Sequence, residues 1–170
     1  MGSLNGYRAN ASFSNPMGIA LDSEGTIYTA DSQNNLIRKI NSKGIVTTLA
    51  GSGKTGNEDG KGEEASFFYP TALTVDKKGN VFVADTHNNL IRKISSEGVV
   101  TTVAGKTGVR FDNPVGIALD KSGNLFVSDW HNKIWKIDPG ERYHPGREWR
   151  PGSQRWRRVV RIFLYPPGDC

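Results

Sequence analysis

The chain has 170 residues, and with 36% hydrophobic and 23% charged residues its composition is that of one globular domain rather than a disordered chain. No apolar run approaches the roughly 18 residues that a membrane-spanning helix needs, so we expect no such helix. The single cysteine, Cys170, excludes an internal disulfide framework and a cysteine-cluster metal site.

The net charge of +5 is concentrated at one end of the chain. Residues 1–140 carry 15 lysines and arginines against 14 acidic residues, whereas residues 141–170 carry 7 arginines against 3 acidic residues. The first part is therefore close to neutral, which weakens the case for a nucleic-acid surface there. The last part is an Arg-, Trp- and Pro-rich tail with three interpretations: a basic nucleic-acid arm, an extension that packs on the body, or a non-native end.

Two long segments of the chain repeat each other without a gap. Pro16–Gly51 and Pro70–Gly105 are identical at 19 of 36 aligned positions, and both contain the run NNLIRKI. A third copy, Pro114–Asp138, has lost one residue between Asn132 and Ile134. Repeats of this length indicate a stack or ring of small units, none of which buries its own apolar face alone.

Each of the first two copies contains four short apolar runs separated by turn residues. In the second copy, Asp76–Gly79 and Ser95–Gly98 have the polar start and the glycine end of tight turns. No segment shows a 3.6-residue period over about ten residues, so helices should be scarce. We therefore predict a four-stranded antiparallel meander. Its strands in the second copy are Ala72–Val75, Val81–Ala84, Leu90–Ile94 and Val99–Ala104.

The repeated pattern resembles a known family. The run P-x-G-I-A-L-D-x-x-G, continued by A/S-D-x-x-N, I-R-K-I and TTLAG, is similar to the NHL repeat over about Phe13–Asp138. The resemblance implies an all-β fold, a β-propeller of four-stranded antiparallel blades, and the family most often has six of them. Residues 1–140 would hold about three blades, at residues 13–51, 65–105 and 111–138.

Three blades do not close a propeller, so we expect a partial, open ring. Met1–Asn10 should be the end of an inter-blade loop, and the third copy lacks its fourth strand. Arg158–Leu164 is apolar and β-branched enough to supply that strand. Three explanations of the open ring remain: two chains paired as three plus three blades, a fragment of a larger product, or a stable arc.

Acidic residues recur at the end of the second strand of each copy, each followed by an asparagine. A residue that every blade needs usually holds the blade, so we interpret the set as structural turn residues rather than catalytic ones. The set is Asp31, Asp85 and Asp129 with their expected partners Asn34, Asn88 and Asn132. His87 and His131 occupy equivalent positions without an evident third ligand. We predict no catalytic residue, no cofactor and no metal.

One rim of the propeller should carry the loops between the second and third strands together with the long inter-blade loop Gly51–Glu64. On this rim, the residues between the recurring Asp and Asn differ from copy to copy. Residues that differ on a fixed scaffold are where binding specificity can lie, and an exposed tryptophan suits such a surface. The candidate partner-binding residues are Gln33, His87, Trp130 and His131.

These observations predict a non-enzymatic binding or scaffold module whose partner is a protein. RNA is the less favoured partner, because the body is nearly neutral and the long loop carries acidic residues. Two other partners are the remaining blades of a propeller and a second copy in a homodimer, and we expect no membrane partner. The alternative is a fragment of a propeller enzyme, since propellers similar to this include metal-dependent lyases and lactone hydrolases. The sequence indicates no cellular compartment.

Overall fold

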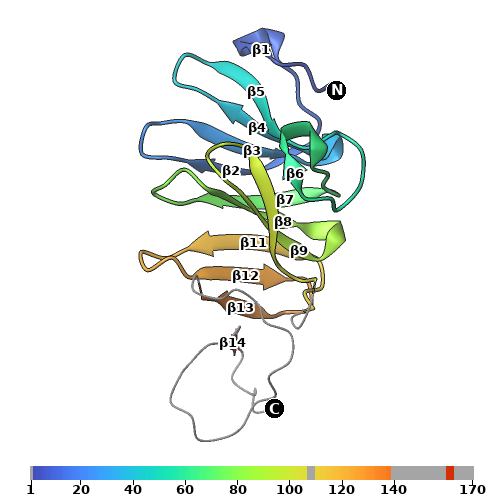
Figure 1. The fold of residues 1–170 in the computed structure, drawn as a ribbon, viewed down its shortest axis with the longest axis vertical. Coiled ribbons are helices and arrows are strands. Elements are labelled where there is room, and N and C mark those ends of the chain that lie inside the picture. Colours follow the sequence, from blue (N-terminus) through green and yellow to red (C-terminus); the bar gives the residue numbers. More distant parts are fainter. Residues whose placement is uncertain (1, 107–109, 139–159, 163–170) are drawn as a thin grey trace, which may run out of the picture.

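The computed structural model describes residues 2–106 and 110–138 and the backbone of residues 160–162 (Figure 1). These residues form three antiparallel sheets that follow one another along the long axis of the molecule, and we call them blades 1 to 3. The helices of the described residues are single 3-10 turns: η1 (Arg8–Asn10), η2 (Ser32–Asn34), η3 (Gly62–Glu64) and η4 (Thr86–Asn88). None of them is long and apolar enough to cross a membrane.

Blades 1 and 2 have the same strand order, and blade 3 has one strand fewer. Blade 1, in the order β1-β5-β4-β3-β2, comprises β1 (Gly6–Tyr7), β2 (Pro16–Leu21), β3 (Ile27–Asp31), β4 (Leu36–Ile40) and β5 (Ile45–Ala50). Blade 2, in the order β6-β10-β9-β8-β7, comprises β6 (Gly60–Lys61), β7 (Pro70–Val75), β8 (Val81–Asp85), β9 (Leu90–Ile94) and β10 (Val99–Ala104). Blade 3, in the order β11-β12-β13-β14, comprises β11 (Pro114–Leu119), β12 (Leu125–Asp129), β13 (Ile134–Ile137) and β14 (Val160–Ile162). The all-β propeller architecture and its open ring are therefore confirmed, and the four strands predicted for the second copy correspond to β7–β10.

The turns between the first two strands of each blade are built around an aspartate. Asp76 Oδ1 accepts hydrogen bonds from the backbone amides of Lys78 and Asn80, at 2.8 and 2.9 Å. The following glycine, Gly79, has a φ of 76°, which a residue without a Cβ adopts at little cost. Because the side chain replaces a backbone partner inside the turn, the sequence Asp-x-x-Gly fixes where one strand ends and the next begins.

The hydrophobic core lies between blades rather than inside one. The first core cluster joins Tyr28, Ala30 and Ile37 of blade 1 to Leu73 and neighbouring residues of blade 2. A second cluster joins blade 2 to blade 3 through Ala84, Ile91, Phe111, Leu125 and Val127. Blade 2, the middle blade, therefore buries both of its faces against its neighbours, as a propeller requires.

The segment before blade 1 has the form of an inter-blade loop and also contributes a strand. β1 pairs antiparallel with β5, with Gly6 opposite Val46, and β6 pairs in the same way with β10. The two segments share the sequence pattern G-x-x-(N/D)-G-x4-A-S-F, at Gly2–Phe13 and Gly56–Phe67. The repeat therefore begins earlier in the chain than Pro16, and each of these blades carries a short fifth strand at its outer edge.

The outer edge of blade 3 is formed by the C-terminal part of the chain. The backbone of β14 pairs antiparallel with β13, with Ile134 opposite Ile162. This part of Arg158–Leu164 therefore takes the place of the fourth strand that the third copy lacks. The rest of the 141–170 tail lies outside the described residues.

Candidate functional site

The loop between the second and third strands of blades 1 and 2 is one 3-10 turn followed by a left-handed asparagine. Asn35 and Asn89 have φ values of 55° and 57°, in a region that asparagine tolerates better than most residues. The first residue of each turn, Ser32 or Thr86, is buried. Within the 3-10 turn itself, only the second residue, Gln33 or His87, is exposed.

Asp31 and Asp85 at the start of these turns hold three parts of the blade together. Asp85 Oδ1 accepts the amide of Phe68 at 2.8 Å, and its Oδ2 accepts the side chains of Asn88 and Arg92 at 2.8 and 2.9 Å. Asp31 is bonded in the same way in blade 1, by Ser14, Asn34 and Arg38. Burial raises the pKa of the Asp85 carboxyl and these hydrogen bonds lower it, and burial is the larger effect, so the net pKa is raised. Both carboxylates are fully occupied by structural partners.

The arginine of the repeated IRKI run is buried completely, which the sequence analysis did not anticipate. Arg92 Nη1 donates to Ser66 O at 3.0 Å as well as to Asp85, and its Nη2 donates to Glu58 O and Asp59 Oδ1 at 2.7 and 2.8 Å. Arg38 makes the equivalent bonds in blade 1. From the sequence alone, an arginine in a short strand would be expected to point its charge to the solvent. The signal that could have identified it is the recurrence of G-x-x-(N/D)-G before each of these blades.

The third blade is arranged differently because its turn is one residue shorter. Asp129 accepts hydrogen bonds from the Lys133 amide at 3.1 Å and from Trp135 Nε1 at 2.8 Å, and Trp135 occupies the strand position of Arg92. Asn132, expected to correspond to Asn88, has instead the left-handed backbone of Asn89, with a φ of 56°. The deletion thus moves the asparagine to the end of the turn.

Three candidate residues are held on the rim by the same backbone hydrogen bond. The amides of Gln33 and His87 donate to Ser14 O and Phe68 O, both at 3.1 Å. The amide of Trp130 donates to Asp112 O at 3.0 Å, so the shorter turn places Trp130 where blade 2 has His87. Equivalent scaffold positions in the three blades therefore present an amide, an imidazole and an indole.

The side chains on this rim form two aromatic or charged clusters. In blade 2 the His87 ring stacks on Tyr69, with centroids 4.8 Å apart, and meets the edge of Phe68 at the same distance. In blade 3, Trp130 is 65% exposed, and His131 Nδ1 lies 2.6 Å from Asp112 Oδ2. In blade 1, Gln33 Oε1 accepts a hydrogen bond from the Ser14 hydroxyl at 2.7 Å. The rim is therefore partly aromatic, and its side chains are ordered by local contacts.

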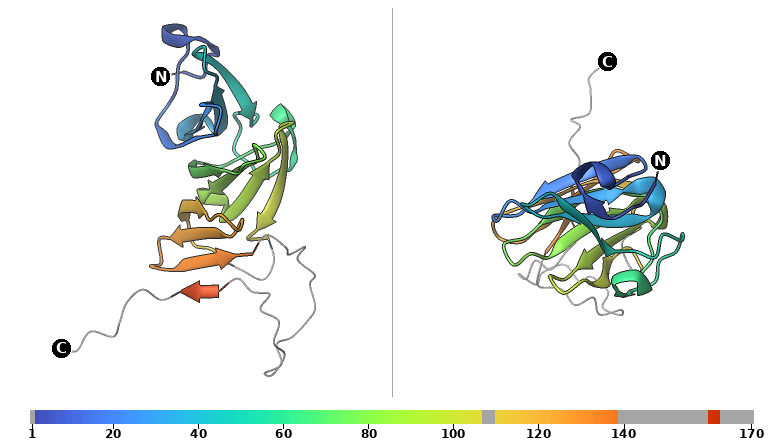
Figure 2. Two further views of the ribbon diagram at one scale, coloured as in Figure 1. Left: turned by 90° about the vertical axis from the view of Figure 1, so that its left-hand side faces the viewer. Right: turned by 90° about the horizontal axis from the view of Figure 1, so that it is seen from above.

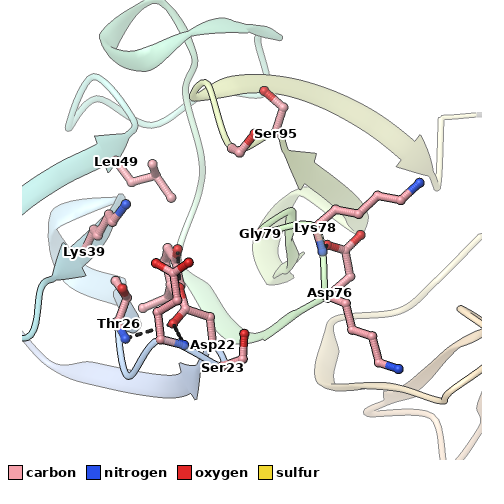
Figure 3. Close-up of a pocket in the computed structure, with 13 residues that line it drawn as sticks. Asp22, Ser23, Thr26, Lys39, Leu49, Asp76, Lys78, Gly79 and Ser95 are labelled. Carbon is pink, nitrogen blue, oxygen red and sulfur yellow. Dashed lines mark hydrogen bonds between the residues drawn. The ribbon is translucent and has the colours of Figure 1, made fainter.

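The opposite rim, which carries the short turns, contains hollows that the sequence analysis did not anticipate. A cavity of about 280 Å³ lies between blades 1 and 2, where Asp22 and Lys39 lie on one side and Asp76 and Lys78 on the other (Figure 3). A second cavity, of about 550 Å³, lies between blades 2 and 3. It is lined by apolar residues, lysines and aspartates: Phe82, Val103, Leu119, Leu125 and Ile137, with Lys77, Lys78, Lys93 and Lys121 and with Asp76, Asp120 and Asp138.

The two aspartates at the first cavity, Asp22 and Asp76, are engaged in turns. Desolvation raises the pKa of Asp22, but hydrogen bonds from the Thr26 and Glu24 amides and the Tyr28 hydroxyl outweigh it, so the net pKa is lowered. Burial, together with the hydrogen bond to Asp22, raises the pKa of Tyr28 to about 12. Among residues 2–106 and 110–138, no three His, Cys, Asp or Glu side chains come together as a group that could hold a metal ion.

Comparison with known proteins places this geometry in a family. Residues 4–57 and 53–115 match the family model of the Teneurin NHL domain. The chain belongs to the NHL-repeat family. The resemblance seen in the repeats is thereby confirmed, and the matched region begins before Pro16, in agreement with the early start of the repeat in the structure.

The NHL-repeat chain spans only a small part of the curated relatives that it matches. It is 41% identical over 95 residues to protein SUPPRESSOR OF QUENCHING 1, chloroplastic, of Arabidopsis thaliana, covering 55% of this chain and 9% of that protein. It is 32% identical over 116 residues to human NHL repeat-containing protein 2, covering 61% of this chain and 16% of that protein. The repeats are thus shared with proteins that are several times longer.

Solved β-propellers have a similar shape. A Bacteroides thetaiotaomicron protein of unknown function superposes with a TM-score of 0.65 at 26% identity, over 76% of this chain and 37% of that one. A streptogramin B lyase superposes with a TM-score of 0.58 at 22% identity, over 74% of this chain and 38% of that one. At that identity, the likeness to the lyase shows the fold alone.

Proposed function

We propose that this NHL-repeat chain is a non-enzymatic scaffold that binds a protein partner through the rim formed by Gln33, His87, Trp130 and His131. The observation that carries the proposal is the shared backbone hydrogen bond that fixes different side chains at equivalent positions in the three blades. A rigid frame with variable side chains is the arrangement that recognition loops use. Trp130 and His87 would supply the aromatic contact area that dominates many interfaces.

Two further features support a protein rather than an enzymatic or RNA-binding role. Asp31 and Asp85 are buried and bonded to an arginine, an asparagine and a backbone amide, so neither is free to act as a general base. The first 140 residues are nearly neutral, whereas an RNA-binding face depends on an excess of lysine and arginine. The rim is also a different surface from the two ends of the arc, where further blades would join.

The test is affinity capture from a cell extract with the full chain and with the double variant His87→Ala, Trp130→Ala. Both side chains are exposed, so the variant should fold as the wild type does. We expect at least one partner protein whose recovery from the extract falls by tenfold or more with the rim variant. The matched control is the double variant Lys78→Ala, Lys121→Ala, which changes exposed residues of the opposite rim and should leave the recovery unchanged.

Three results would contradict the proposal. One is a partner whose recovery is lost with the lysine variant and not with the rim variant. Another is binding of single-stranded RNA that weakens steeply with added salt and needs the rim aromatic residues, which would assign the rim to RNA. The third is chelator-sensitive turnover of a lactone or cyclic peptide substrate by the chain, which would favour the enzyme alternative.

A further inference from the structure

One face of blade 1 is apolar and uncovered. Met17, Ile19 and Leu21 alternate along β2 on the face that points away from blade 2, and they are 53%, 64% and 61% exposed. We call these three residues the head face. The corresponding residues of β7 include Thr71 and Leu73, which are 8% and 6% exposed because blade 1 covers them. The head face is thus the counterpart, on blade 1, of a surface of blade 2 that the preceding blade buries.

Blade 3 lies at the opposite end of the arc from blade 1 (Figure 2), and its outward face also carries residues that are not fully buried. On the face of blade 3 that points away from blade 2, Ala118 is exposed and Phe126, Ser128 and Ile134 are half-buried. We call these four residues the tail face. The equivalents of Ser128 and Ile134 are completely buried in the other blades: Ala30 and Ile37 in blade 1, and Ala84 and Ile91 in blade 2.

The two uncovered faces correspond to the two sides of a contact that the chain already makes between blades 1 and 2. Leu73 of blade 2 packs in one cluster with Tyr28, Ala30 and Ile37 of blade 1. The tail face offers Phe126, Ser128 and Ile134 at those same strand positions, and the head face offers Ile19 at the position of Leu73. We propose that a second copy of this chain docks its tail face on the head face of the first, head to tail.

A glycine supports the same contact. A Cβ on Gly18 would lie 2.7 Å from the Thr71 carbonyl oxygen of the next blade, so this position lets two blades approach closely. Blade 3 has a glycine at the equivalent position, Gly116, where the nearest atom to such a Cβ is Ser128 Oγ of its own blade. Gly116 thus leaves the tail face without a Cβ at the position where Gly18 lets blade 2 approach blade 1.

A polar link between blades can also be repeated at the new joint. Asn35 Oδ1 accepts the amide of Tyr69 at 2.9 Å, and Asn89 Oδ1 accepts the amide of Asn113 at 2.7 Å. Asn132 has the same left-handed backbone as Asn35 and Asn89, and Asn15 shares the positive φ of Tyr69 and Asn113. In the docked pair, Asn132 of one copy would accept the amide of Asn15 of the other.

Head-to-tail contacts close into a ring when the rotation per unit allows it and otherwise form open chains. With two copies, the tail of each meets the head of the other, and both joints are identical. We therefore expect a dimer in which six blades form one ring. This dimer does not depend on the rim proposed above to bind a protein, because the joints use the ends of the arc.

The test is light scattering after gel filtration of the full chain, at several concentrations. We expect a mass twice the 18.6 kDa of one chain. Ile19→Asp should give the monomer mass, because the charge falls on the head face, and circular dichroism should show an intact fold since Ile19 is already exposed in the arc. The control is Leu4→Glu, at a residue that is 67% exposed and whose equivalent in blade 2 is Glu58, and it should stay dimeric.

A mixing experiment distinguishes this pairing from others. Ala118→Glu should also give a monomer, because it places a charge on the tail face. An equimolar mixture of the Ile19→Asp and Ala118→Glu chains retains one intact joint, so heterodimers should appear at concentrations where neither variant dimerises alone. A wild-type monomer, an open oligomer, or a dimer that only one of the two substitutions disrupts would overturn the proposal.

Discussion

The buried guanidinium of Arg92 is the most consequential single group in blade 2. It donates hydrogen bonds to the carboxylates of Asp85 and Asp59 and to the carbonyl oxygens of two other residues in the segment before the blade. It therefore connects this segment to the turn that begins at Asp85. In blade 3 the same strand position is occupied by Trp135, which donates one hydrogen bond to Asp129. The polar groups around Arg92 therefore all depend on this one side chain. At the equivalent position of blade 3, a tryptophan with a single hydrogen bond takes its place.

We predict that Arg92→Met destabilises the protein by about 3–5 kcal/mol, because it leaves the buried Asp85 carboxylate without its charged partner. The measurement is urea unfolding of the variant beside the wild type. Lys93→Met is the control. Lys93 follows Arg92 in the strand and its side chain is only half-buried, so this substitution should change stability by less than about 1 kcal/mol. If the two substitutions lower the free energy of unfolding equally, the hydrogen bonds of Arg92 make no special contribution to stability.

A second prediction at the residue scale concerns pH. The side-chain hydrogen bond from Asn124 lowers the pKa of Asp120 below 3.8 in the folded chain. A carboxyl whose pKa is lower in the folded state stabilises the fold above the unfolded pKa, and this stabilisation is lost as the pH falls through the folded pKa. We expect Asp120→Asn to lower the urea midpoint at neutral pH and to differ less from wild type below about pH 4.

The comparison for this prediction is Glu97→Gln, a change at an exposed carboxyl in the other type of turn. Its urea midpoint should follow the wild type across the whole pH series. A gap between wild type and Asp120→Asn that stays constant from neutral to acid pH would show that the charge of Asp120 is not the cause.

At the scale of the element, strands and turns were largely predictable and their edges were not. The Asp-x-x-Gly turns and the alternating apolar residues located β7–β10, because both signals are local. The strands β1 and β6 have two residues each and no apolar pattern, so only their pairing with β5 and β10 reveals them. The match between the two segments before these blades, Gly2–Phe13 and Gly56–Phe67, lies ahead of Pro16 and Pro70 and consists mainly of glycine and polar residues.

In each of the first two blades, a glycine that touches the neighbouring turn directly follows the last full strand. Gly105 has a φ of 105°, and a Cβ there would lie 2.3 Å from the Asn89 carbonyl oxygen. We predict that Gly105→Ala destabilises the protein by more than about 2 kcal/mol, from backbone strain and a backbone clash together. Thermal unfolding measures it, and Gly25→Ala is the matched variant, because Gly25 has a φ of 78° but no atom within 4 Å.

Gly25→Ala should therefore show the strain of a left-handed residue alone, about 1 kcal/mol. If the two alanine variants unfold at the same temperature, the contact between Gly105 and the turn contributes nothing to stability.

At the scale of the whole molecule, hydrogen bonds between blades accompany the apolar clusters. The Ser32 hydroxyl donates to Pro70 O at 2.6 Å, and the Thr86 hydroxyl donates to Pro114 O at 2.7 Å. Both hydroxyls are buried and lie in the turns between the second and third strands. From the sequence, the loop between the second and third strands would be expected to be exposed surface. In the structure, its first residue is part of the contact with the next blade.

We predict that Thr86→Val destabilises the protein by about 1–3 kcal/mol, since it leaves a buried carbonyl oxygen without its donor while conserving shape. Chemical denaturation measures the loss. Thr101→Val is the control at an exposed position of β10, and its effect should stay within about 0.5 kcal/mol. A control that loses as much as Thr86→Val would indicate a general effect of replacing threonine rather than a link between blades.

The rim residues could be placed from the sequence, but their neighbours could not. The position of the loop between the second and third strands follows from the meander, so Gln33 and His87 were expected on one rim and lie there. The one-residue deletion in blade 3 shifted the correspondence, so that Trp130 rather than His131 matches His87. The stacking of His87 on Tyr69 and the two cavities between blades depend on side chains from separate repeats, and no local pattern encodes them.

The pairing of β6 with β10 has a consequence for how such chains change over evolution. β6 precedes blade 2 in the chain and closes its outer edge, so a blade and its edge strand are encoded in one continuous stretch. Corresponding residues of the first two stretches, such as Asn15 and Tyr69, are 54 positions apart. A gene duplication or deletion of that length adds or removes a complete blade and leaves no orphaned strand, so the number of blades can change in a single genetic step.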